Sequence, residues 1–160
     1  MLTLVDAYSR YLLRAELLVE PTGPNVQRVL DSAFQEFGVP AAIRSDNGPP
    51  FASTGAGGLT MRLGIELQRI EPGKRQQNGR LERVHLTLEE VVAEPAANPT
   101  KQQRAIDLWR YEYNEVRPHQ ALHMKTPAAV FVPSKRHYPR KLVDPMQWEP
   151  DETYALDKHG

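Results

Sequence analysis

Two carboxylates, Asp46 and Glu82, have the placement in this sequence that most directly suggests chemistry. Asp46 ends a short apolar segment and precedes Asn-Gly and Pro-Pro, which are turn signals. Glu82 follows with 35 residues between them, in the first turns of a predicted helix. Carboxylate oxygens suit hard divalent cations, and two such cations can clamp the attacking and leaving oxygens of a phosphoryl transfer. The pair therefore predicts a metal site that acts on phosphate esters.

The surroundings of Glu82 are basic and polar, as contact with a nucleic-acid backbone requires. The residues assigned to phosphate contacts are Lys74, Arg75, Asn78, Arg80 and Arg83. Such contacts orient nucleic acid without reading its sequence. Each half of the pattern also has a simpler interpretation when it stands alone. Asp46 fits an ordinary turn, and Glu82 fits a solvated helix residue paired with Arg80 or Arg83.

The segments before Asp46 are predicted to form a β-hairpin, a helix and a strand. Residues 1–18 are strand-rich around a bend at residues 7–10, which is typical of a hairpin. Apolar residues recur at helical spacing over residues 26–37, and glycine and proline then end the helix. Residues 41–44 form a predicted strand that presents Asp46 at its C-terminal end, where open α/β sheets bind ligands.

The segments between the two acids and around the second one are predicted in less detail. Residues 52–58 are glycine-rich and are predicted to be loop, while residues 59–63 allow about one helical turn. Alternation over residues 65–70 predicts a strand. An apolar stripe over residues 81–92 predicts the helix that carries Glu82 at the margin of its buried face.

A long helix is predicted to begin near Thr100, whose hydroxyl suits an N-cap. Its predicted packing residues are Ala105, Leu108, Trp109 and Tyr113. Thr126 opens a short last helix, and the basic segment over residues 135–141 fits either DNA contact or a solvated tail. His85 and His119 are interpreted as solvated or DNA-facing rather than as metal ligands, because their spacing matches no zinc site.

Composition sets looser limits. A chain of 160 residues suits one domain with its own core. There are 20 basic and 20 acidic residues, yet residues 116–143 contain no acid and the segment after them is acidic; this asymmetry permits a basic face. Cysteine is absent, which excludes disulfides and thiolate metal sites. No signal peptide or membrane-length apolar run occurs, so we expect a cytoplasmic protein without membrane contact.

Four sequence blocks occur in this chain in the same order as in one protein family. They are Val-Asp-Ala-Tyr-Ser-Arg at residues 5–10 and Ser-Asp-Asn-Gly-Pro-Pro-Phe at residues 45–51. Then come Gln-Asn-Gly-Arg-Leu-Glu-Arg-Val-His at residues 77–85 and Tyr-Asn-Glu-Val-Arg-Pro-His-Gln-Ala-Leu at residues 113–122. Thr-Pro-Ala follows at residues 126–128. Together these blocks resemble DDE transposases, the insertion-sequence branch of the retroviral integrase superfamily.

The resemblance implies a fold, a reaction and partners. The fold is a ribonuclease H-like mixed sheet flanked by helices. The reaction is DNA strand nicking followed by strand transfer, with two Mg²⁺ (or Mn²⁺) ions in the complete family site. Asp46 and Glu82 match the second and third catalytic acids, which are metal ligands in the family. The partners are DNA, both transposon ends and target, and further copies in a homo-oligomer.

The chain also departs from the family pattern. The family uses three carboxylates, and the first lies on a strand that precedes the block at residues 5–10. Asp6 matches an aspartate near the hairpin bend instead, so we do not assign it to the metal site. We therefore expect the sheet to lack its first, central strand. Residues 1–124 are interpreted as a partial catalytic core, and residues 125–160 as a basic and then acidic tail.

Two functional hypotheses follow. The first is a transposase or integrase catalytic region that is inactive as this truncated chain. The alternative is a non-catalytic remnant that acts at most as a DNA-binding or dimerising module. A nuclease acting on RNA–DNA hybrids is less favoured, because the block at residues 113–122 resembles transposases.

Overall fold

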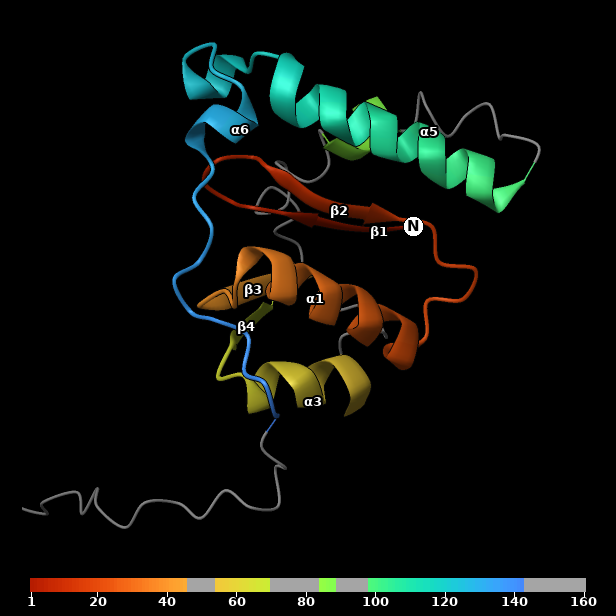
Figure 1. Ribbon diagram of the computed structural model, residues 1–160, viewed down its shortest axis with the longest axis vertical. Helices are drawn as coiled ribbons and strands as arrows, with labels where there is room; N and C mark the ends of the chain where they lie inside the picture. The colour runs from red at the N-terminus through yellow and green to blue at the C-terminus, as the bar shows by residue number, and fades with distance from the viewer. Residues whose placement is uncertain (46–53, 70–83, 89–97, 143–160) are drawn as a thin grey trace, which may run out of the picture.

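The computed structural model describes residues 1–45, 54–69, 84–88 and 98–142 (Figure 1). A helix also covers residues 84–88. The other elements, in chain order, are β1 (Leu2–Val5), β2 (Leu12–Glu16), α1 (Gly23–Phe37), β3 (Ala42–Ser45), α3 (Thr54–Arg62), β4 (Glu66–Arg69), α5 (Pro99–Tyr111), a π-helical turn (Glu112–Val116), a 3₁₀ turn (Gln120–Leu122) and α6 (Pro127–Val130). Within these residues, no helix is long and apolar enough to cross a membrane.

Strands β1 and β2 form the hairpin predicted from the sequence. They pair antiparallel from Leu2 opposite Glu16 to Val5 opposite Leu12, and the register shifts just before Val5. Side chains on a strand alternate between its two faces. Accordingly, Leu2 and Leu4 pack on the side of α1, while Val5 packs on the side of α5. The hairpin therefore lies between two layers of helix, as Figure 1 shows.

The layer below the hairpin in Figure 1 contains α1, α3 and the β3–β4 pair. Helix α1 presents the apolar stripe that its sequence predicts, and Gly38 ends it with a φ of 82°. The buried residues of this first cluster are Val26, Leu30, Ala33, Phe34, Val39, Leu59, Leu63 and Ile65. Removing this apolar surface from water is what holds α1 and α3 together.

The layer above the hairpin consists of α5, with helix 84–88 contributing to the same core. The buried residues of this second cluster are Leu12, Ala15, Val84, Leu88, Ile106 and Tyr113. Val84 and Leu88 were predicted to lie on the inner stripe of their helix, and both are buried. The helix that follows Glu82 in sequence is thus fixed against β2 and α5.

The strands that the structure describes form two pairs. β3 and β4 run parallel, from Ala42 opposite Glu66 to Ser45 opposite Arg69. Among the described strands, the antiparallel β1–β2 pair and the parallel β3–β4 pair are not hydrogen-bonded to each other. This pairing agrees with the expected mixed sheet, which was predicted to be interrupted between β1 and β3.

Helix α3 begins earlier than the sequence predicted. It starts at Thr54, so the loop predicted over residues 52–58 was wrong for residues 54–58. Leu59 is fully buried and Leu63 is 7% exposed, both within the first cluster. Burial of these two side chains outweighs the low helix propensity of the glycines before them.

Helix α5 also differs from its prediction at both its start and its packing face. Asn98, not Thr100, is the N-cap, and its side chain accepts a hydrogen bond of 2.9 Å from the Lys101 N–H. Asparagine caps at least as well as threonine, and proline suits the first helical position that follows. Leu108, predicted to pack, is 67% exposed, while Ile106 is fully buried.

Candidate functional site

The residues predicted to carry the chemistry lie outside the described residues. They are Asp46, Glu82, Lys74, Arg75, Asn78, Arg80 and Arg83. The structure does describe the elements next to the two acids, which are strand β3 and helix 84–88. The candidate site is therefore built up from these two elements and from what holds them.

Strand β3 ends at Ser45, one residue before Asp46. Ser45 is 8% exposed, so the end of the strand is buried against its surroundings. Its partner β4 runs parallel, and ligands of open α/β sheets bind beyond the C-terminal ends of such strands. On the exposed side of the pair, Arg44 donates to Gln68 Oε1 over 3.2 Å. Asp46 therefore directly follows, in the sequence, a strand end that is buried and paired with β4.

The described part of this helix, residues 84–88, follows Glu82 closely in the sequence and is anchored on two sides. Val84 is 3% exposed and Leu88 fully buried in the second cluster. Beside this apolar stripe, His85 Nε2 lies 2.7 Å from Thr3 Oγ1 on β1, in a hydrogen bond between residues 82 positions apart. His85 is half-buried and is held by β1, so the interpretation as a solvated histidine was wrong, while contact with DNA stays a prediction.

The outer edge of β2 is covered by side chains of α5 and the π-helical turn. Asn114 is 2% exposed and forms two hydrogen bonds with Leu12. Its Oδ1 accepts from the Leu12 N–H over 2.8 Å, and its Nδ2 donates to the Leu12 carbonyl over 3.0 Å. One amide side chain therefore satisfies both backbone groups of a strand residue, as a neighbouring strand would.

Gln103 repeats this contact further along the same edge. Its Oε1 accepts from the Leu17 N–H over 2.9 Å, and its Nε2 donates to the Ala15 carbonyl over 2.8 Å. Gln103 and Asn114 are eleven positions apart, which is about three helical turns, so both face the strand. An exposed sheet edge invites pairing with another chain, and these amides close it. The sequence analysis did not single out either residue. Polar amides on an inward-facing helix stripe are a usable signal for such contacts with a strand edge.

The π-helical turn places consecutive residues inside the protein. Tyr113 is 6% exposed, and its neighbour Asn114 is also buried. Tyr113 stacks on Trp109 with ring centroids 5.1 Å apart and contacts His119 edge-on at 4.7 Å. Burial lowers the pKa of His119. His119 is thus part of an aromatic cluster, and its interpretation as a solvated or DNA-facing residue was wrong.

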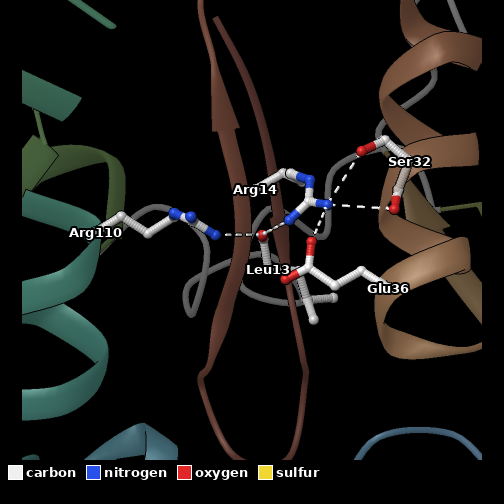
Figure 2. Close-up of polar contacts among 5 residues, drawn as sticks. All are labelled: Leu13, Arg14, Ser32, Glu36 and Arg110. Atoms are coloured by element: carbon white, nitrogen blue, oxygen red, sulfur yellow. Dashed lines mark hydrogen bonds and ion pairs between the residues drawn. The ribbon is translucent and has the colours of Figure 1, made fainter. Parts of the chain in front are cut away.

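Arg14 joins the hairpin to α1, as Figure 2 shows. Its guanidinium forms an ion pair with Glu36 and donates to both the hydroxyl and the carbonyl of Ser32. The same guanidinium lies over the Phe37 ring, 5.2 Å from its centroid. The Leu13 carbonyl accepts from Arg14 on one side and, over 2.8 Å, from Arg110 of α5 on the other. These contacts tie both helix layers to β2.

Asp6 serves the hairpin bend. Its Oδ2 accepts from the Ser9 N–H over 2.7 Å and from the Ser9 hydroxyl over 2.6 Å. Ser9 is fully buried, so the carboxylate and the hydroxyl stabilise each other within the turn. This role agrees with leaving Asp6 out of the predicted metal site.

The segment over residues 134–142 crosses the ends of α1 and α3, and we name it the C-terminal strap. Arg136 donates to the Pro40 carbonyl over 2.8 Å and to the Leu63 carbonyl over 2.5 Å. The Tyr138 hydroxyl donates to Asp31 Oδ1 over 2.6 Å. Neither DNA contact nor a solvated tail, the two predicted alternatives, describes Arg136 and Tyr138; both bind the protein itself.

Comparison with known proteins identifies the family. Two family models, both described as integrase core domain, match residues 1–75 and residues 63–127. The chain belongs to the integrase core family. It is a transposase- or integrase-type catalytic region, as the sequence blocks predicted.

A relative encoded by an insertion element is similar to most of the chain. The chain is 36% identical over 129 residues to the protein described as "Insertion element IS476 uncharacterized 39.2 kDa protein" of Xanthomonas euvesicatoria. The match covers 79% of this chain and 37% of that protein. The chain thus spans well under half of this relative's length.

Solved structures confirm the ribonuclease H-like fold. The catalytic core domain of BIV integrase is 26% identical and superposes with a TM-score of 0.65, covering 80% of this chain and 82% of that one. The catalytic core of HTLV-2 integrase in complex with magnesium, in a trimeric form, is 19% identical with a TM-score of 0.61. That match covers 79% of this chain and 80% of the HTLV-2 chain and bears on the fold alone.

Proposed function

We propose that the chain provides the metal-binding centre for nicking and joining DNA in transposition, with Asp46 and Glu82 as its ligands. The observation that carries the proposal is the buried end of β3 at Ser45, directly before Asp46, in a chain of the integrase core family. Helix 84–88 packs against the hairpin and lies just after Glu82 in the sequence, as β3 lies just before Asp46.

The proposed donor set fits a hard divalent cation. Two carboxylates offer oxygen ligands, which Mg²⁺ and Mn²⁺ prefer over the thiolates that this chain lacks. When bound, two such ions neutralise charge at the scissile phosphate and stabilise the attacking and leaving oxygens. Asp46 and Glu82 would hold these ions.

The proposed substrate is DNA, first at transposon ends and then at a target. In the first step water attacks a phosphodiester and a 3′-hydroxyl leaves. In the second, a 3′-hydroxyl attacks a target phosphodiester, and the displaced strand carries away the leaving 3′-oxygen. The side chains proposed to hold the phosphate backbone are Lys74, Arg75, Asn78, Arg80 and Arg83. Relatives solved as dimers, trimers and an intasome support self-association.

We further propose that residues 1–160 alone bind the metal but do not cut DNA. Asp6, the acid nearest the hairpin bend, is already bound by Ser9 and does not supply a third ligand. Among the described strands, β1 and β3 belong to separate pairs. A non-catalytic DNA-binding or dimerising remnant is the alternative.

The test is a Mn²⁺ titration of residues 1–160 followed by electron paramagnetic resonance, together with a plasmid-nicking assay in Mg²⁺ and in Mn²⁺. We expect saturable Mn²⁺ binding that is lost in Asp46→Asn and in Glu82→Gln, and no nicking. Binding that survives both substitutions would overturn the assignment of the ligands and favour the remnant. Nicking by the unsubstituted chain that disappears in Glu82→Gln would overturn the proposed inactivity.

A further inference from the structure

A basic surface lies at the end of the molecule where the β1–β2 hairpin closes. Figure 1 shows this closed end at the same end as α6, and the rings of Tyr11 and Phe131 stack across the two with centroids 4.4 Å apart. We name this region the hairpin-end surface and define it by Arg10 in the hairpin bend, Arg117 after the π-helical turn, and Lys125 before α6. Residues 116–143 contain no acid, so the segment with Arg117 and Lys125 contributes positive charge alone.

Arg10 and Arg117 are far apart in the sequence but act on the same two side chains. Burial lowers the pKa of His119, and the positive charges of Arg117 and Arg10 lower it further. Burial raises the pKa of Tyr113, and the same two charges oppose that rise. The rings of Tyr113 and His119 meet edge-on with centroids 4.7 Å apart, so both charges act within one small region. Two positive charges in one region repel each other, and a bound anion would offset that repulsion.

The backbone holds Lys125 beside the same cluster. The His119 N–H donates to the Lys125 carbonyl over 3.0 Å, and the Met124 N–H donates to the His119 carbonyl over 3.0 Å. His123 and Met124 close this turn with φ values of 53° and 62°. Such conformations are uncommon for residues other than glycine and persist only where the surrounding structure holds them. The exposed side chain of Lys125 therefore extends from a fixed point near His119.

Acidic residues near the hairpin-end surface do not neutralise it. Asp6 is already bound within the hairpin bend. Burial raises the pKa of Tyr11, and the negative charge of Glu115 raises it further, so this carboxylate lies toward Tyr11. Among the residues that the structure describes, no acid forms an ion pair with Arg117 or Lys125, and both side chains are exposed. Their charges are therefore accessible to a partner.

We propose that the hairpin-end surface binds the phosphate backbone of duplex DNA. Guanidinium groups bind phosphate through paired, charge-assisted hydrogen bonds, and lysine adds a point charge. Three cations spread over two segments suit successive phosphates of a backbone, whereas a free phosphate ion would occupy one position. The surface shares no residue with the phosphate contacts proposed above for residues 74–83. It rests on the proposed function only for the identity of the partner, which is DNA.

The test measures binding of a short DNA duplex to residues 1–160 by fluorescence anisotropy, with a chelator present so that no divalent metal takes part. We expect Arg117→Gln and Lys125→Gln each to raise the Kd about two- to fivefold, which is the effect of losing an exposed ion pair. Each should also flatten the slope of log affinity against log salt concentration by about 0.9. Arg117→Lys keeps the charge and should keep the slope.

A matched control separates this surface from the effect of net charge. Lys101 is exposed in the first turn of α5, whereas Arg117 follows the far end of that helix. Lys101→Gln should alter neither the Kd nor the slope. Equal effects of Lys101→Gln and Lys125→Gln would overturn the inference. If Arg117→Gln lowers the melting temperature, Lys125→Gln alone decides the test.

A competition experiment distinguishes a DNA backbone from a free anion. Inorganic phosphate, added at constant ionic strength, should not displace the duplex from the unsubstituted chain. Displacement that is absent in Arg117→Gln would identify a site for a free phosphate ion and would overturn the assignment to DNA.

Arg80→Ala and Arg83→Ala report separately on the phosphate contacts of the proposed function. If these two substitutions weaken DNA binding while Arg117→Gln and Lys125→Gln leave the Kd and the slope unchanged, only the hairpin-end surface fails. If Arg117→Gln and Lys125→Gln weaken binding while Arg80→Ala and Arg83→Ala do not, the hairpin-end surface stands and the phosphate contacts of the proposed function fail.

Discussion

Asn114 binds both backbone groups of Leu12, a residue 102 positions earlier in the chain. The contact connects two sequence blocks that mark the family, the one at residues 5–10 through its hairpin and the one at residues 113–122 directly. Its location in a buried edge contact assigns Asn114 to the fold. Within this block, Asn114 therefore holds the hairpin in place.

Replacing Asn114 with alanine should strongly destabilise the protein. The Leu12 N–H and carbonyl would lose their partners in a buried setting, which costs about 1–3 kcal/mol for each group. We expect the free energy of unfolding to fall by about 2–5 kcal/mol in urea denaturation. Gln103→Ala is the matched control: Gln103 is only half-buried, so water can replace it and the loss should be about 1 kcal/mol. Equal losses for the two variants would contradict this account.

Two glycines should respond in opposite ways to alanine. Gly38 has a φ of 82°, and a Cβ there would meet the Ser134 carbonyl oxygen at 2.4 Å. Gly38→Ala should therefore lower the free energy of unfolding by more than about 1 kcal/mol, through both strain and the displaced strap. Gly58 lies within α3, and a Cβ there would meet nothing within 4 Å. Gly58→Ala should raise that free energy by about 0.5–1 kcal/mol, measured by urea denaturation.

The sequence predicted the individual helices and strands better than the contacts between them. The stripe of α1 and the hairpin could be read from residue spacing, because each buries one periodic face. The start of α3 could not, since burial of Leu59 and Leu63 depends on contacts distant in the chain. The same holds for Arg136, a basic residue whose partners are the carbonyls of Pro40 and Leu63. For the candidate site, the two acids stay a prediction from the sequence, and the structure describes strand β3 and helix 84–88, which lie next to them in the chain.

The ionisation of Tyr138 should link the C-terminal strap to pH. Burial and the hydrogen bond to Asp31 raise the pKa of Tyr138 from 10.0 to about 12. The folded state therefore favours the protonated phenol. Its contribution is complete below pH 10 and is lost as the pH rises towards 12. Urea denaturation between pH 8 and 12 should show stability falling in the original protein and falling less in Tyr138→Phe. Identical profiles would show that the hydroxyl does not couple to folding.

Arg80 and Arg83, which lie outside the described residues, should contribute to DNA affinity without selecting sequence. The reason is their predicted place on the helix around Glu82, where charge meets phosphate. Each phosphate contact adds about 0.9 to the slope of log affinity against log salt concentration. Arg80→Ala and Arg83→Ala should each weaken binding to all duplexes alike and flatten that slope by about this amount in fluorescence anisotropy. Arg104, exposed on α5, is the control, and Arg104→Ala should alter neither quantity. A changed sequence preference with an unchanged slope would instead identify Arg80 or Arg83 as a base-reading residue.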